Sequence, residues 1–289
     1  MITMKNNKTK IIILGIVAVV CVAAIIAFVV FFLPKMMNAE PTASPDQAIE
    51  KATIKATADE ISTSEKNKIT ENETNVEPES TEAKPAIQAP DDMVNLLSNN
   101  NNTIDDLSDI GCKQLITVSS NGFNAHIDFY ELNESKWTLD ESLSCEGFVG
   151  SNGVTSDMHE GGYASPRGLY PVSDAFYIYE KPETGLNTFE VTNDTYWVDD
   201  PDSKYYNKRV EGTSDKDWNS AEHMIDYTTA YEYGFVIDYN HDAVYNAGSA
   251  IFFHVSYSST AGCVGTDRDM VLQYLAKLDS NRNPFILIL

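Results

Sequence analysis

The sequence predicts a mostly β domain that follows one N-terminal membrane-spanning helix and a disordered stalk. Three observations predict this organisation. Residues 11–33 form an apolar run of 23 residues without a charge, and residues 36–90 contain no aromatic side chain. From residue 114 onward, short apolar and alternating runs are separated by turn residues, which is typical of strands. We therefore expect a tail (1–10), a transmembrane anchor (11–33), an extracellular linker (34–92) and a folded domain (93–289).

The run 11–33 is long enough to cross a bilayer. At about 1.5 Å per residue it spans the hydrocarbon core with some tilt. Lys5, Lys8 and Lys10 precede it and only Lys35 follows closely, so the positive-inside rule places the N-terminus in the cytoplasm and the domain outside. A cleaved signal peptide is the alternative, but its apolar core is usually only about 7–15 residues long. We expect a single-pass protein of the cell membrane.

The linker and the overall charge restrict the possible partners. Residues 36–90 are rich in Thr, Glu, Ala, Pro, Ser, Lys and Asn, and such a segment cannot bury enough apolar area to offset its ordering entropy. The chain carries a formal net charge of -23 and has a pI near 4.4. No basic patch is visible, which excludes nucleic acid as a partner.

The body of the chain reads as strands with few helices. Apolar and alternating runs predict strands over 115–118, 125–132, 174–179 and 234–239, and Trp137 begins a further segment. In the second of these, Ile127 and Phe129 share one face and His126 points to solvent. Residues 92–110 indicate a short helix at the domain edge. Residues 159–170 form a glycine-rich loop, the kind of segment that often carries a binding site.

The C-terminal segment orders a strand, a turn, a helix and a strand. Ala250 to Phe253 predict a buried strand that ends at His254, and a polar turn leads to Cys263. A helix follows, with Thr266 as its expected N-cap and a core-facing stripe; residues 285–289 close the chain as a strand. The stripe consists of Val271, Tyr274, Leu275 and Leu278.

His254 and Cys263 lie nine positions apart across this turn. A histidine beside a cysteine is the minimum equipment for a thiol nucleophile, and the predicted helix N-terminus just after Cys263 would stabilise a thiolate. The alternative is a core cysteine and a strand-end histidine that never meet. If Cys263 is free, Cys112 and Cys145 remain as a possible disulfide whose pairing the sequence does not give; Cys21 lies within the apolar run.

Other catalytic classes lack their motifs. The chain contains no S-x-x-K, and its histidines do not form an H-E-x-x-H zinc site, so we expect neither a metal nor a cofactor. Glu222-His223 forms a polar pair that we place on the surface, and His241 lies in a solvated turn. The aromatic-rich region 187–247 suits either a groove for sugar or peptide or a core.

The stretch from Ser249 through His254 to Thr260-Ala261-Gly262-Cys263-Val264, with the acidic helix start and the final strand, resembles the signature of the L,D-transpeptidase catalytic-domain (YkuD-like) family. The resemblance covers about residues 112–289. Upstream features agree in order: Trp137, the turn 150–153, the loop from Glu160-Gly161 to Ser165-Pro166-Arg167-Gly168, the pair Tyr206-Asn207, and Glu222-His223. The chain departs from the family at Ala261, where many members have histidine, at Gly162, where a carboxylate is common, and in the short His–Cys spacing.

This resemblance implies a β-sandwich and a bacterial cell-wall enzyme that forms 3→3 peptidoglycan cross-links through a cysteine acyl-enzyme. Donor and acceptor stem peptides would be its partners, and carbapenems could acylate it. The implied catalytic residues are Cys263 and His254, with Gly262, Ala261 and Thr260 at the oxyanion turn. The implied substrate contacts are Glu160, Arg167, Tyr206, His223 and Arg268. An L,D-carboxypeptidase that trims tetrapeptides and an inert wall-binding module remain the alternatives.

Overall fold

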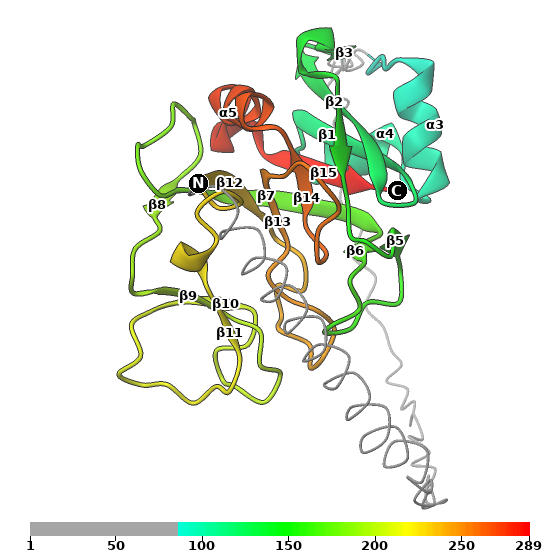
Figure 1. Cartoon of the computed structure of the whole chain (residues 1–289). Coiled ribbons are helices and arrows are strands. Elements are labelled where there is room, and N and C mark those ends of the chain that lie inside the picture. The colour runs from blue at the N-terminus through cyan, green and yellow to red at the C-terminus, as the bar shows by residue number, and fades with distance from the viewer. Residues whose placement is uncertain (1–85) are drawn as a thin grey trace, which may run out of the picture. The chain divides into compact units, whose positions relative to one another are not determined.

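The computed structural model describes residues 86–289, drawn in colour in Figure 1. The predicted tail, the predicted anchor and most of the predicted linker lie outside these residues, so those assignments stay predictions. Within residues 86–289, no helix has the length and apolarity needed to cross a membrane.

Most of the regular structure is strand, which confirms the prediction of a mostly β domain (Figure 1). The three α-helices of this region are α3 (Asp91–Asn99), α4 (Ile104–Asp109) and α5 (Arg268–Lys277). The strands are β1 (Gln114–Asn121), β2 (Asn124–Asn133), β3 (Lys136–Leu139), β4 (Cys145–Phe148), β5 (Val154–Thr155), β6 (Ser165–Pro166), β7 (Gly168–Tyr177), β8 (Thr188–Glu190), β9 (Thr195–Val198), β10 (Lys208–Glu211), β11 (Ala221–His223), β12 (Tyr233–Ile237), β13 (Phe252–Val255), β14 (Val264–Thr266) and β15 (Pro284–Ile288).

The main sheet has ten strands and closes on itself. Its order is β1-β15-β7-β12-β13-β14-β4-β2-β3, with β8 added beside β7. Closure follows because β1 pairs with β15 in parallel and with β2 in antiparallel orientation. The strands β10-β9-β11 form a separate small sheet, and β5 pairs with β6. A closed sheet leaves few unpaired edges.

The first two strands behave as the sequence predicts. In β2, Ile127 and Phe129 are fully buried, and His126 is exposed beside Glu146, 2.9 Å from its carboxylate. The prediction that His126 faces solvent is therefore confirmed. The strand β1 runs to Asn121 rather than stopping at Val118, because its polar end still pairs with β2.

The N-terminal edge contains two helices where one was expected. Thr103 starts α4, since its side chain accepts from the Asp106 N–H while the Asp106 carboxylate accepts from the Thr103 N–H, which is a capping box. The domain also begins before the predicted boundary at 93: the Gln88 N–H donates to Ser135 O, and the Trp137 N–H donates to Gln88 O, both at 2.8 Å.

The alternation of side chains along β13 determines which face of the sheet carries His254. Phe253 and Val255 enter the core beneath α5, whereas Phe252 joins a second cluster on the other face of the sheet. Because side chains alternate along a strand, His254 shares the face of Phe252. The strand begins two residues later than predicted, because Ala250 adopts a left-handed φ of 53° that interrupts extended backbone.

Helix α5 covers the core face of β12, β13 and β14 (Figure 1). The predicted stripe is confirmed, with Val271, Tyr274 and Leu275 fully buried and Leu278 1% exposed.

The predicted N-cap of α5 was wrong. Asp267 caps the helix by accepting from two backbone N–H groups, while Thr266 belongs to β14. The strand β14 thus separates Cys263 from the helix, and because a helix dipole acts only within about a turn, it does not stabilise a thiolate there.

Cys112 and Cys145 do not form a disulfide: both are free thiols, which answers the question that the sequence left open. They belong to different apolar clusters. The Cys112 thiol donates to Gln114 O at 3.3 Å, and the Cys145 sulfur lies 3.6 Å from Thr266 Oγ1. Their separation follows from the sheet order, because β1 and β4 are not neighbours.

Candidate active site

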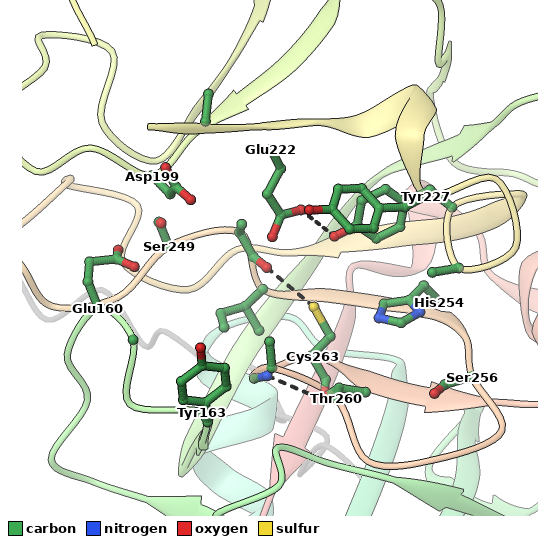
Figure 2. Close-up of a pocket in the computed structure, with 18 of the residues that line it drawn as sticks. Glu160, Tyr163, Asp199, Glu222, Tyr227, Ser249, His254, Ser256, Thr260 and Cys263 are labelled. Carbon is green, nitrogen blue, oxygen red and sulfur yellow. Dashed lines mark hydrogen bonds between the residues drawn. The ribbon is translucent and has the colours of Figure 1, made fainter. Parts of the chain in front are cut away.

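A pocket of about 620 Å³ opens beside the second apolar cluster. Cys263 and His254 both line it, and Figure 2 shows their side chains at one end of it. The opposite end contains Glu160, Asp199 and Ser249, and Glu222 lies between the two ends in this view. Segments from four distant parts of the chain therefore line one pocket that contains Cys263.

The turn before Cys263 is fixed by two hydroxyl groups. Thr260 Oγ1 donates to Cys263 O at 2.6 Å and accepts from the Gly262 N–H at 3.2 Å. The fully buried Ser165 hydroxyl accepts from the Gly150 N–H at 2.9 Å and lies 2.6 Å from Gly262 O. A Cβ on Gly262 would lie 3.1 Å from Ala164 O, so the tight approach favours glycine.

Replacing Ser165 with alanine is expected to lower the free energy of unfolding by about 1–3 kcal/mol, because it leaves the buried Gly150 N–H without an acceptor. Urea unfolding of the two proteins measures this difference. Ser173→Ala is the matched control: Ser173 is exposed, so its loss should change stability by less than about 0.5 kcal/mol. Equal effects of the two substitutions would contradict the structural role of Ser165.

The Cys263 thiol is protonated at rest. It donates to Ala250 O at 3.3 Å and accepts from the Phe252 N–H at 3.4 Å. The left-handed backbone at Ala250, which costs roughly 1–2 kcal/mol for a residue with a Cβ, accompanies this inward carbonyl. Burial raises the pKa of the Cys263 thiol well above its ordinary value, and the nearby Glu222 carboxylate raises it further.

His254 has the tautomer that a base requires. Its Nδ1 lies 2.8 Å from Val255 O, and since a carbonyl only accepts, Nδ1 carries the proton and Nε2 has a free lone pair. Burial lowers the pKa of His254 to about 4, so the ring is neutral near pH 7. The Tyr231 ring packs edge-on against it, with centroids 5.4 Å apart.

The strand register brings His254 toward Cys263. Phe253 pairs with Val264 in a parallel ladder, so Cys263 lies opposite Phe252, two residues before His254 on the same face. Neighbouring strands are about 4.8 Å apart and rise about 3.3 Å per residue, which puts the two Cα atoms roughly 8 Å apart. Gly265 stands opposite His254, and the Ser256 side chain packs against it. No hydrogen bond joins His254 to Cys263 within residues 86–289, because the thiol donates to Ala250 O and His254 Nδ1 bonds to Val255 O.

The backbone at Cys263 offers one donor for an oxyanion. The Gly262 N–H is already bonded to Thr260 Oγ1, whereas the Cys263 N–H has no acceptor within residues 86–289. Of the predicted oxyanion turn, Thr260 therefore shapes the turn, Ala261 is exposed at the pocket wall, and the Cys263 N–H is the available donor.

Glu222 is the titratable group that connects the two ends of the pocket. It lies on β11 opposite Trp197, and the Tyr231 hydroxyl donates to its carboxylate. Burial raises the pKa of Glu222 to about 7, and the charges of Asp199 and Glu160 act in the same direction, whereas the Tyr231 hydrogen bond opposes them. Glu222 and His223 are both half-buried: β11 turns Glu222 toward the pocket, and His223 stacks on Tyr196.

Glu222→Gln is expected to change the pH dependence of stability. The folded-state pKa of about 7 exceeds the ordinary value of 4.5, so Glu222 contributes stability that is complete below pH 4.5 and is lost as pH rises through 7. The free energy of unfolding of the variant should rise relative to wild type by on the order of 3 kcal/mol between pH 4.5 and 8. Urea unfolding at both pH values tests this, with the exposed Glu190→Gln as control; a constant difference would contradict it.

The predicted substrate contacts divide into two groups. Glu160 lines the pocket, and the Tyr206 hydroxyl, buried behind it, donates to its carboxylate at 2.5 Å and accepts from the Gly248 N–H at 3.0 Å. Three others lie outside the residues that line the pocket. Arg167 is exposed beside a different hollow, His223 stacks on Tyr196, and Arg268 pairs with Glu232 at 2.9 Å.

Several lining residues were missed at the sequence level: Tyr163, Asp199, Tyr227, Tyr231 and Ser249. Tyr163 and Tyr227 are exposed aromatic side chains at the pocket, and the aromatic density of 187–247 was the available signal for Tyr227 and Tyr231. No group of three or more His, Cys, Asp or Glu side chains within residues 86–289 could hold a metal ion.

Comparisons with known proteins identify no relative of this chain. No protein-family model, no curated protein and no solved structure matches this chain. The functional argument therefore rests on the pocket and on the sequence motif around Cys263.

Proposed function

We propose that this protein is a membrane-anchored L,D-transpeptidase that forms 3→3 cross-links in peptidoglycan through a Cys263 acyl-enzyme. The observation that carries the proposal is that a thiol and a neutral histidine line the same pocket from the same face of the sheet. The resemblance of 249–264 to the family signature supplies the substrate class, and an L,D-transpeptidase-like β-sandwich is part of the same proposal. The predicted anchor at 11–33 would hold the domain outside the cell, facing the wall.

The proposed reaction begins with proton transfer. Since the Cys263 thiol is neutral at rest, His254 Nε2 takes its proton as the sulfur attacks the carbonyl of the third stem residue. The Cys263 N–H donates to the developing oxyanion. The C–N bond to the terminal D-Ala breaks, the leaving nitrogen receives the proton from His254, and a thioester remains. The side-chain amine of a second stem then displaces the sulfur.

Product analysis tests the proposal. Purified full-length protein is incubated with disaccharide-tetrapeptides, and the products are separated and weighed by mass spectrometry. Cross-linked dimers with release of D-Ala support transpeptidation, whereas trimmed monomers alone indicate an L,D-carboxypeptidase. If neither product forms, the inert wall-binding module is the remaining alternative. The departure from the family signature at Ala261 motivates that alternative. Acylation of Cys263 by a carbapenem argues against that module. Slow labelling of Cys263 by an alkylating reagent does not argue for it, because burial raises the pKa of the thiol.

A further inference from the structure

The pocket is strongly acidic. Glu160, Asp199 and Glu222 line it together with Cys263, and no lysine or arginine is among its described lining residues. A wall of this charge favours a cationic group. The three acidic residues come from the glycine-rich loop, from the segment after β9 and from β11, so the fold assembles them from separate elements.

Two polar atoms in this pocket lack partners. Asp199 Oδ1 and Ser249 Oγ are buried and make no hydrogen bond within residues 86–289. A carboxylate oxygen can only accept, so a donor for Asp199 Oδ1 comes from outside residues 86–289, either water or a ligand. Leaving such a group unpaired costs free energy. An ammonium group, with three N–H donors and a positive charge, satisfies this requirement.

Glu222 lies within electrostatic reach of both ends of the pocket. Its charge acts on the Cys263 thiol, and the charges of Asp199 and Glu160 act on Glu222. Figure 2 shows its carboxylate between the acidic end and the sulfur. The Tyr231 hydroxyl fixes one carboxylate oxygen, Oε2, which leaves Oε1 available to a ligand.

We propose that Glu222 is the base that deprotonates a cationic primary-amine acceptor, which the charges of Asp199 and Glu160 draw into the pocket that the Cys263 thioester lines. This inference rests on the proposed function and adds a catalytic residue to its second step. It assigns the activation of the two nucleophiles to different groups: His254 deprotonates the thiol in acylation, and Glu222 deprotonates the ammonium in aminolysis. A base that changes charge near pH 7, as Glu222 does, can accept a proton and release it to solvent under physiological conditions.

The step balances. The acceptor ammonium gives one proton to the Glu222 carboxylate and becomes a neutral amine. Its nitrogen attacks the thioester carbonyl, the C–N bond forms and the C–S bond breaks. The second nitrogen proton passes to the Cys263 sulfur by way of His254, which restores the neutral thiol and the neutral imidazole. Protonated Glu222 then loses its proton to water.

The experiment measures the two steps separately in the full-length protein. A tetrapeptide donor alone gives a burst of D-Ala that reports acylation. Adding Nα-acetyl-lysine as the amine reports aminolysis as a new amide, quantified by mass. For Glu222→Gln we expect the burst to persist and aminolysis to fall by about 10²–10³. Wild-type aminolysis should level off above pH 7, whereas the variant should keep rising with pH as free amine accumulates.

Controls separate the possible failures. The exposed Glu190→Gln should match wild type in both steps. Asp199→Asn should raise the KM for the amine about tenfold or more with little change in the burst, which tests the ammonium site even if Glu222→Gln does not fold. Aminolysis by Glu222→Gln at the wild-type rate, or equal loss of burst and aminolysis, overturns the role of Glu222. Absence of a burst in wild type overturns the proposed function itself.

Discussion

Replacing Cys263 with alanine is expected to abolish both the D-Ala burst and dimer formation, with a fall in turnover of at least about 10⁴. The reason is that Cys263 is the thiol among the described lining residues, and removal of a nucleophile typically leaves only the background from binding and oxyanion stabilisation. Mass analysis of the products from disaccharide-tetrapeptides, at equal protein concentrations, measures the loss.

Two further variants make this result specific. Cys263→Ser should be equally inactive yet folded, because a hydroxyl can still donate to Ala250 O. Cys145→Ser is the matched control, since Cys145 lies outside the pocket and its contact with Thr266 Oγ1 can be kept by a hydroxyl. It should retain wild-type turnover. Activity retained in Cys263→Ala would remove the nucleophile from this account.

His254→Gln is expected to reduce acylation by about 10²–10⁴, the usual contribution of a positioned base. Glutamine approximates the size of imidazole but has no basic nitrogen. His241→Gln is the control, because His241 is exposed and pairs with Asp238 at 3.0 Å outside the candidate active site. The rate of the D-Ala burst in each variant measures the effect.

The pH profile gives a sharper test of His254. A solvated histidine loses its basicity as pH falls through about 6.5, but burial lowers the pKa of His254 to about 4. The acylation rate should therefore not decline because of His254 between pH 7 and 5, and its loss should appear only near pH 4. A decline centred on pH 6.5 that disappears in His254→Gln would contradict the buried, neutral ring.

The sequence predicted the elements that depend on local pattern. The stripe Val271, Tyr274, Leu275 of α5 and the alternation of Ile127 and Phe129 in β2 were recognisable because each depends only on period and burial. His254 and Cys263 were likewise visible as residues, and the parallel pairing of β13 with β14 brings them to one face.

Features that depend on long-range pairing could not be predicted. Both Thr266 and Asp267 are good N-caps, and only the capture of Thr266 by β14, where its hydroxyl donates to Glu146 O at 2.8 Å, leaves the cap to Asp267. Glu222 looked like a surface residue because its burial requires β9 and the distant Tyr231. Arg167 and Arg268 have guanidinium groups that could bind a carboxylate, but neither side chain lines the pocket.

The central claim, a covalent acyl-enzyme at Cys263, is tested most directly by peptide mass mapping. Full-length protein is mixed with a tetrapeptide donor or a carbapenem, quenched in acid and digested. We predict an acyl adduct on the peptide that contains Cys263, absent in Cys263→Ala and unchanged in Cys145→Ser. An adduct confined to another residue would contradict the account. So would substrate turnover by Cys263→Ala at the wild-type rate.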